Sequence, residues 1–572
     1  MSLPEQLLRT QRFTLGAPHD ITVGRTVLFR RSGALWSLDP ERVLLDDVDE
    51  YAVDGDTIAC AVRGELFVIR DGTARRIATP GSITRPRPRG DRVAYLHHGT
   101  LHVDGPIASD VEDYWWSPDG ARLLIARSDA SHVDHAAVGG PNPVISLAIV
   151  DLTGAHTAVE FDLEYLVTAG WDAHGPYAVG LTRDQRTQRF LAIGAQTTVA
   201  GEWRDRCWVP EIPGLPARTA SGALVAHLDR DGTRHLTVGG VPVTPAGLQL
   251  REVQRVEGDR IVFTASPHPT ETRCYAYETE VAEIDEPRIR SDAEEPVLRT
   301  NRTRLVLGPR ELRADLYLPS WHEAGVALPV LLDSYGGPSR QRVTDAGDWR
   351  DLVSQWFAEH GFAVLVIDGA GTPGRGPDWE REIHRDQYGP VLADQVDGLH
   401  AAARERADLD LSRVGIRGWS FGGTIAELAV LRRPDVFHAA IAGAAPTDPR
   451  RYNARFRERY LGQPDDNPEG YDAYRLLDEA PNLTRPLLLM HGLADDNVRP
   501  EHTKRMSAAL LAAGKPHEMV LLPGVGHAAI GSSATVEILR TQVDFLRRHL
   551  SPPRADPPPV DRPPHTNPAS RP

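Results

Sequence analysis

A serine lies in a glycine-rich segment of the kind that presents a nucleophile. Residues 418–423 read Gly-Trp-Ser-Phe-Gly-Gly, directly after the apolar run 414–417 and directly before a stretch with helical spacing of apolar residues. A serine on a tight strand-to-helix turn has a strained backbone, and the residues two before and two after it must be small. The helix N-terminus also favours negative charge beside that serine. We therefore predict that Ser420 is a nucleophile and not part of a plain glycine-rich turn.

An acid and a histidine follow the serine in the order that this chemistry requires. A serine hydroxyl needs a general base, and the base needs a carboxylate that orients it. Asp495 follows the apolar run 486–490, and His527 lies on a glycine-rich loop after the next apolar run. The order Ser, Asp, His is that of α/β hydrolases. Asp496 stays an alternative acid, because spacing cannot separate adjacent carboxylates, and we interpret His491 as structural.

Two donors are predicted for the oxyanion. One is the backbone N–H of Phe421, the residue after the nucleophile. The second comes from the loop 334–338, Ser-Tyr-Gly-Gly-Pro, which follows the apolar run 329–333 and offers the hydroxyl of Tyr335. Taken alone, the tetrapeptide Tyr-Gly-Gly-Pro at 335–338 is typical of a turn.

The elements that position these residues belong to a predicted α/β domain. After residue 295, near-continuous apolar runs such as 329–333, 362–368 and 486–490 alternate with segments whose apolar residues recur every three to four positions. Buried parallel strands covered by helices have this pattern. The sequence predicts a mostly parallel sheet with helices on both faces, the α/β-hydrolase fold, over residues 291–551.

The chain before this domain is predicted to be all-β. From about residue 20 to 285, short alternating apolar and polar runs are broken by Gly, Asp and Pro, and a similar hairpin recurs. Four-stranded units of about 40 residues favour a β-propeller over a sandwich. We assign residues 1–290 to the propeller and residues 552–572, rich in proline, to a disordered tail.

Composition narrows the class of protein. The net charge of −15 argues against nucleic-acid or anionic-membrane partners, and we see no apolar run of membrane-spanning length. Three widely spaced cysteines suit neither a disulfide framework nor a zinc site. No charged leader with an apolar stretch opens the sequence, so a cytoplasmic location is predicted. The chemistry needs only side chains and water, so neither cofactor nor metal is predicted, and a homodimer stays open.

The assembled motifs resemble the prolyl oligopeptidase superfamily, and within it the dipeptidyl peptidase IV branch. Residues 418–423 are close to that branch's nucleophile elbow, and 491–498, His-Gly-Leu-Ala-Asp-Asp-Asn-Val, resemble its acid loop. The resemblance implies Asp495 as the triad acid and Tyr335 as the oxyanion tyrosine. It also implies a propeller that caps the active site, which agrees with the strand repeats.

The resemblance further implies a pocket for the residue before the scissile bond. The run 458–462, Glu-Arg-Tyr-Leu-Gly, sets the register of the preceding loop. The side chains that this register assigns to substrate binding are Tyr452, Phe456, Asn497 and Val498. Such a pocket suits proline or a small apolar side chain. The alternative is that the aromatic residues only pack a helical insert.

Two departures from the branch affect specificity. The branch holds the α-amine of its substrate with paired glutamates before a Trp-Trp motif, but residues 104–113 here contain no such pair. Asp110, Glu112 and Asp113 are either substitutes or solvated loop acids. Ala370 replaces an arginine that is usual in the family, which puts a local salt bridge in doubt.

The sequence therefore predicts a serine peptidase that hydrolyses short peptides, dipeptidyl-peptidase-like, through an acyl-enzyme. The alternatives are an acylaminoacyl-peptidase, an oligopeptidase or a carboxylesterase with the same triad. A propeller binding protein with a relic hydrolase is a third reading, which an inert Ser420 would support.

Overall fold

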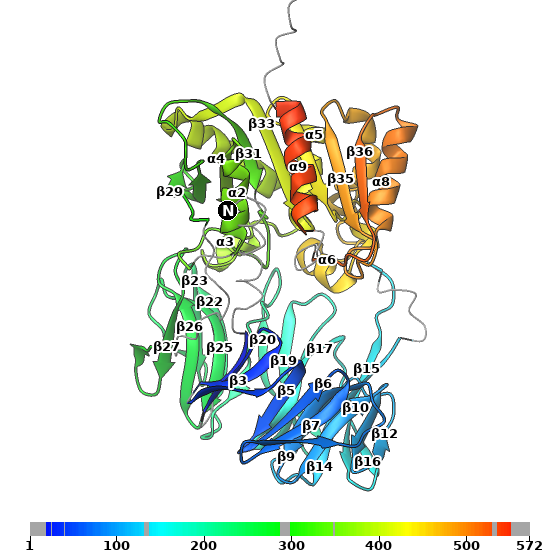
Figure 1. The fold of residues 1–572 in the computed structure, drawn as a ribbon. Helices are drawn as coiled ribbons and strands as arrows, with labels where there is room; N and C mark the ends of the chain where they lie inside the picture. The colour runs from blue at the N-terminus through cyan, green and yellow to red at the C-terminus, as the bar shows by residue number, and fades with distance from the viewer. Residues whose placement is uncertain are drawn as a thin grey trace, which may run out of the picture.

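The computed structural model describes residues 19–23, 26–38, 40–130, 137–285, 298–333, 335–346, 349–528 and 535–550. The predicted tail 552–572 and the predicted boundary at residue 290 lie outside these ranges. Figure 1 shows two parts stacked on each other, an all-β part below and a helix-covered sheet above.

The N-terminal part is a β-propeller, as predicted, and it has seven blades in the described residues. Each blade is a four-stranded sheet whose strands follow one another in sequence. The first four blades are β1 (His19–Val23), β2 (Val27–Arg31), β3 (Ala34–Leu38), β4 (Glu41–Leu45); β5 (Val48–Asp54), β6 (Thr57–Val62), β7 (Glu65–Arg70), β8 (Thr73–Ile77); β9 (Ile83–Arg89), β10 (Arg92–His97), β11 (Thr100–Val103), β12 (Pro106–Ala108); and β13 (Asp113–Trp116), β14 (Arg122–Asp129), β15 (Val144–Asp151), β16 (His156–Val159). The other three are β17 (Tyr165–Asp172), β18 (Gly175–Leu181), β19 (Thr187–Ile193), β20 (Thr197–Arg204); β21 (Ala217–Arg218), β22 (Leu224–Arg230), β23 (Thr233–Val238), β24 (Val241–Pro242); and β25 (Gln249–Glu257), β26 (Arg260–Ser266), β27 (Arg273–Tyr277), β28 (Val281–Glu283).

Asp-Gly turns close two of the hairpins that the sequence pattern indicated. Asp71 and Gly72 link β7 to β8, and Asp231 and Gly232 link β22 to β23. All four residues have positive φ, between 48° and 71°. Two-residue hairpin turns of this kind match the right-handed twist of the strands, which is why Asp-Gly marks them.

The C-terminal part is the predicted α/β hydrolase. Its eight-stranded sheet has the order β29-β30-β32-β31-β33-β34-β35-β36, and every neighbouring pair from β32 onward is parallel. The strands are β29 (Arg302–Leu307), β30 (Leu312–Tyr317), β31 (Leu328–Asp333), β32 (Ala363–Asp368), β33 (Leu409–Trp419), β34 (Ala439–Gly443), β35 (Leu487–Gly492) and β36 (Glu518–Leu522). The helices are α2 (Trp349–Glu359), α3 (Pro377–Arg381), α4 (Gly389–Glu405), α5 (Phe421–Arg432), α6 (Ala454–Leu461), α7 (Pro468–Asp472), α8 (Glu501–Ala512) and α9 (Thr535–Leu550), with 3₁₀ turns η1 (Pro449–Arg451) and η2 (Leu476–Asn482).

Both faces of this sheet are buried under helices. Val330 and Leu332 pack into one apolar cluster with residues of α4, α5 and α8, whereas Leu331 between them packs into another with residues of α2 and α9. Successive side chains of a strand point to opposite faces, so a strand buried on both sides reads as a continuous apolar run. No helix in the described ranges is long and apolar enough to span a membrane.

The side of the hydrolase that faces the propeller carries α3 and α6 (Figure 1). Ion pairs join the two parts: Arg381 contacts Asp205 and Asp229, and Arg183 contacts Glu458 at 2.8 Å. The carboxyl ends of β31, β33 and β35 lead into the loops at this side. Residues from separate loops can therefore meet beneath the propeller.

Candidate active site

Ser420 lies on the predicted turn between β33 and α5. Its backbone has φ 58° and ψ −119°, a left-handed conformation that costs free energy for any residue with a side chain. A Cβ on Gly418 would lie 2.0 Å from the carbonyl oxygen of Gly422, and one on Gly423 would lie 2.4 Å from that of Gly443. A side chain at either position would clash with these carbonyl oxygens, so glycine is required there. This close packing leaves the serine side chain clear of the strand and the helix.

Asp495 and His527 come together at the ends of β35 and β36. Nδ1 of His527 lies 2.8 Å from Oδ2 of Asp495. The other carboxylate oxygen accepts the backbone N–H groups of Asn497 and Val498, at 3.0 and 2.9 Å. Asp495 is buried, whereas Asp496 is exposed. The geometry therefore favours Asp495 as the residue that orients the imidazole.

His491 packs against the same carboxylate from the buried side. Its Nε2 lies 2.8 Å from the carbonyl oxygen of Val498 and 3.3 Å from Oδ2 of Asp495, and its Nδ1 lies 2.7 Å from Oγ1 of Thr503. Burial lowers the pKa of His491. A neutral His491 held by these partners supports the acid loop, in agreement with a structural role.

Two of the three triad candidates, Ser420 and His527, line one cavity of about 380 Å³, and Asp495 lies behind His527. Ser420 and His527 line it together with Tyr335, Phe421, Tyr452, Phe456 and Asn497. The indole N–H of Trp419 donates to the backbone carbonyl of His527 at 2.7 Å, so the residue before the serine ties the histidine loop to the elbow. Among the residues that the structure describes, no group of three or more His, Cys, Asp or Glu side chains is placed to hold a metal ion.

Tyr335 reaches the cavity from the loop after β31. Burial raises the pKa of its hydroxyl to about 12, so the hydroxyl stays protonated and remains a donor at neutral pH. Its ring centroid lies 5.7 Å from that of Phe421, whose N–H begins α5. The two predicted oxyanion donors thus belong to neighbouring residues beside the nucleophile.

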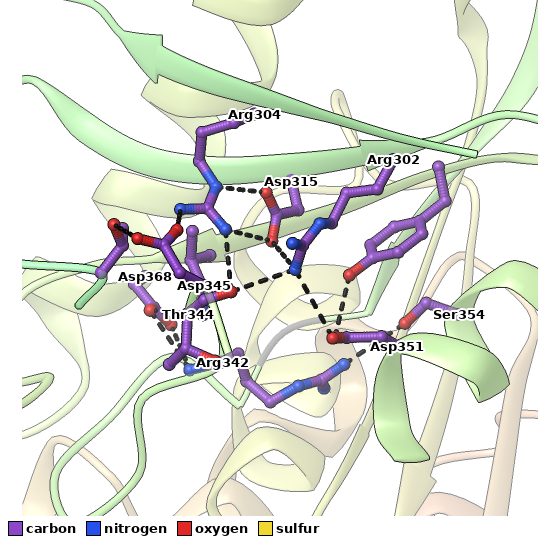
Figure 2. A network of polar contacts seen from close by, with 12 residues as sticks. Arg302, Arg304, Asp315, Arg342, Thr344, Asp345, Asp351, Ser354 and Asp368 are labelled. Carbon is purple, nitrogen blue, oxygen red and sulfur yellow. Dashed lines mark hydrogen bonds and ion pairs between the residues drawn. The ribbon is translucent and has the colours of Figure 1, made fainter. Parts of the chain in front are cut away.

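A polar network anchors the loop that carries Tyr335 (Figure 2). Asp368, at the end of β32, accepts the backbone N–H groups of Arg342 and Val343 at 2.8 to 3.2 Å. Asp345 accepts from the guanidinium of Arg304 at 2.8 Å. Burial raises the pKa of Asp368 to about 6. At neutral pH its carboxylate holds the part of this loop at Arg342 and Val343.

Of the four residues predicted to bind substrate, three line the cavity and one does not. Tyr452 donates from its hydroxyl to Oδ1 of Asn497 at 3.2 Å, and its ring meets that of Phe456 edge to face at 5.8 Å. These three line the cavity. Val498 is fully buried and does not line it. Its backbone N–H holds Asp495 instead.

The structure also shows the surroundings of the two places where the sequence departs from the dipeptidyl peptidase IV branch. Asp113 pairs with Arg85 and Arg87 at 2.8 and 2.9 Å. Neither Asp110, Glu112 nor Asp113 is among the described residues that line the cavity. Near Ala370, the carboxylate of Asp394 accepts the backbone N–H of Ala370 at 2.8 Å and pairs with Arg310 at 2.7 Å, so this acid has a cation of its own.

Sequence reasoning missed Arg457, which lines the cavity beside Tyr452 and Phe456. It is one of three arginines in the run 455–459, Arg-Phe-Arg-Glu-Arg. The other two, Arg455 and Arg459, contact Glu211 of the propeller. Helical spacing alone does not tell which of the three arginines faces the cavity, because their directions depend on how α6 packs between the hydrolase and the propeller.

Fold and site together define a propeller-capped α/β hydrolase. Residues 349–552 match the model of the prolyl oligopeptidase family. Dipeptidyl peptidase 8 of mouse and of human is 36% identical over 220 residues, 37% of this chain and 24% of those proteins. Prolyl endopeptidase FAP of human is 28% identical over 241 residues, 41% of this chain and 31% of that protein.

Solved structures share the whole architecture. The dipeptidyl peptidase 4 of Porphyromonas gingivalis aligns over 93% of this chain and 88% of its own, with a TM-score of 0.70 and 20% identity. A protein assigned as a dipeptidyl aminopeptidase IV from Bacteroides ovatus aligns over 95% and 99%, with a TM-score of 0.77 and 18% identity. The chain spans about a quarter of the length of the curated dipeptidyl peptidase 8 relatives. Residues 349–552 are therefore similar to the prolyl oligopeptidase family, which supports the predicted resemblance.

Proposed function

We propose that this protein is a serine peptidase that cleaves short peptides through an acyl-enzyme on Ser420. The observation that carries the proposal is the contact of 2.8 Å between His527 and Asp495 beside a serine with the strained backbone of a nucleophile elbow. His527 takes the proton of the serine hydroxyl as Ser420 attacks the peptide carbonyl, and later gives it to the leaving amine. Water then hydrolyses the acyl-enzyme.

The oxyanion of the tetrahedral intermediate is held by the hydroxyl of Tyr335 and the backbone N–H of Phe421. A donor of this kind acts best when it is already in place, because no reorganisation is then needed as charge develops. Support for this role comes from the protonated state of Tyr335 and from the network that holds its loop. Tyr452, Phe456 and Asn497 form the walls for the residue before the scissile bond.

The substrate class follows from the relatives and the propeller. Names of the relatives point to dipeptidyl and prolyl peptidases, which supports a preference for proline or a small apolar residue before the scissile bond. A propeller above the site limits access to short peptides. A cytoplasmic location remains a prediction, and a homodimer remains open; light scattering of the purified chain tests the second.

An acylaminoacyl-peptidase or oligopeptidase, or a carboxylesterase, is the second candidate. It is favoured by the placement of Asp110, Glu112 and Asp113, none of which is among the described residues lining the cavity. A substrate amine would then lack the paired acids that the resemblance led us to seek. Such an enzyme would accept a blocked N-terminus.

The deciding experiment compares Gly-Pro-p-nitroanilide with its N-acylated form and with a p-nitrophenyl ester, using wild type and Ser420→Ala. Cleavage of the free-amine anilide alone supports a dipeptidyl peptidase, equal or faster cleavage of the blocked anilide supports an oligopeptidase or acylaminoacyl-peptidase, and cleavage of the ester alone supports a carboxylesterase. Ser420→Ala should abolish every one of these activities. A fluorophosphonate probe that fails to label Ser420 in the folded protein would indicate a non-catalytic binding protein.

A further inference from the structure

Arg457 is a buried arginine, and none of the described residues offers it a carboxylate partner. Only 1% of the residue is exposed to solvent, yet it lines the cavity that contains Ser420. Its Nη1 donates to Oε1 of Gln387, and its Nε has no hydrogen-bond partner among the residues described. Within the part of the chain that the structure describes, no carboxylate lies within ion-pair distance of this guanidinium.

Other buried arginines of this fold have acids beside them. Arg234 contacts Asp229 at 3.0 Å and Glu380 at 2.9 Å, and Arg31 contacts Glu41 at 2.8 Å. A buried cation without an anion is costly, because the low-dielectric interior does not replace the water it has lost. Arg457 differs from these arginines, because it has donors but no anionic hydrogen-bond acceptor beside it in the described parts of the chain.

The surroundings of Arg457 supply aromatic faces and more donors. Its guanidinium carbon lies 5.0 Å from the ring centroid of Tyr452, 5.4 Å from that of Tyr388 and 5.5 Å from that of Phe456. These faces attract a cation weakly. The hydroxyl of Tyr388 and Nε2 of Gln387 are also buried, and neither has a hydrogen-bond partner in the described ranges. Arginine offers donors only, so the cluster lacks an acceptor, which a carboxylate provides best.

We propose that Arg457 makes this pocket a carboxylate-binding pocket, so that the enzyme accepts aspartate or glutamate immediately before the scissile bond. The inference rests on the proposed function, because it places the substrate side chain between Tyr452 and Phe456. The apolar rings contact the methylene groups of the acidic side chain, and Arg457 at the base of the pocket binds its carboxylate. The pocket thus combines apolar walls with one buried positive charge.

The test compares Ala-Glu-, Ala-Gln- and Ala-Met-p-nitroanilide, whose variable side chains are similar in size. Wild type should cleave the Glu substrate with a kcat/KM about tenfold to a hundredfold above the Gln substrate, the range of a hydrogen-bonded charge. The ratio should fall as the pH drops toward the side-chain pKa of the substrate, about 4.3. In Arg457→Met the Glu to Gln ratio should fall to about one.

Matched variants keep the result interpretable. Arg451→Met makes the same substitution at an exposed arginine just before α6 and should keep the wild-type ratio. Arg457→Lys retains the charge with fewer donors, and its ratio should lie between those of wild type and Arg457→Met; it serves as the test if the Met variant does not fold. Equal cleavage of the Glu and Gln substrates by wild type would overturn the proposal and leave bound water as the partner of Arg457.

Binding separates failure of this inference from failure of the proposed function. Calorimetry on Ser420→Ala measures the affinity for the dipeptides Ala-Glu and Ala-Gln without turnover. Tighter binding of Ala-Glu that is lost in the Ser420→Ala, Arg457→Met double variant supports the pocket even if no anilide is cleaved. Cleavage of Ala-Met- and Gly-Pro-anilides with no preference for Glu would leave the peptidase intact and refute the pocket.

Discussion

Asp495 and Asp496 are neighbours in sequence, and their surroundings separate them. Asp495 is buried, contacts His527 and accepts two backbone N–H groups. Asp496 points to solvent. A carboxylate that orients a base must be held still, because a rotating carboxylate does not fix the imidazole tautomer. The hydrogen bonds within the acid loop provide that restraint.

We expect Asp495→Asn to lower kcat by about 10⁴-fold, because an amide in this position favours the wrong tautomer of His527. Steady-state hydrolysis of whichever substrate the wild type cleaves best measures this loss. Asp496→Asn is the matched control and should stay within a few-fold of wild type. A larger loss in Asp496→Asn than in Asp495→Asn would reverse the assignment of the acid.

At the scale of elements, the helix behind the nucleophile contains an unusual acid. Glu427 of α5 is fully buried, and neither of its carboxylate oxygens has a hydrogen-bond partner among the residues that the structure describes. Burial raises its pKa to about 8, well above the value of about 4.3 in an unfolded chain. Folding therefore favours the protonated form of Glu427.

This pKa shift predicts how stability depends on pH. The unfolded chain releases the proton of Glu427 near pH 4.3, whereas the folded chain keeps it until about pH 8, so stability is lost as the pH rises between these values. The free energy of unfolding of Glu427→Gln minus that of wild type should grow by about 1 to 4 kcal/mol from pH 4.5 to pH 8.5. Urea titrations across this range measure it. Parallel curves for the two proteins would show that Glu427 does not titrate in this window.

The loop of Tyr335 shows why elements were easier to predict than their connections. The strands β31 and β32 are continuous apolar runs because helices cover both faces of the sheet, and that pattern is visible in sequence. The partners of the loop, such as Asp368 and Arg304, lie on other strands. Their contacts depend on strand order, which local periodicity does not encode.

At the scale of the whole molecule, the propeller and the hydrolase meet through buried charges on α6. Glu458 has no exposed side-chain surface and accepts from Arg183 at 2.8 and 2.9 Å and from the backbone N–H of Gly139 at 2.9 Å. The same helix carries Phe456 and Arg457 of the cavity. Docking of the propeller therefore positions part of the proposed substrate pocket.

Arg183→Met should lower the free energy of unfolding by about 3 kcal/mol, because it leaves Glu458 buried without its cation. It should also raise KM, since α6 loses a contact that holds the pocket. Chemical denaturation and steady-state kinetics measure the two effects. The control is Arg189→Met, which breaks a pair with Glu202 in the same blade, where Glu202 is exposed, and should change stability by less than about 1 kcal/mol. Equal losses in both variants would argue against a special role for the interface pair.

The sequence by itself indicated the fold class of both parts, the resemblance to the prolyl oligopeptidase family, and the candidate triad Ser420, Asp495, His527. These depend on local signals: apolar periodicity, the small residues that a strained turn requires, and acids or histidines just after strands. Blade number, the partners of the acid loop and the buried position of Arg457 came only from the tertiary structure. They depend on contacts between residues far apart in the chain, and such contacts leave no periodic trace in a single sequence.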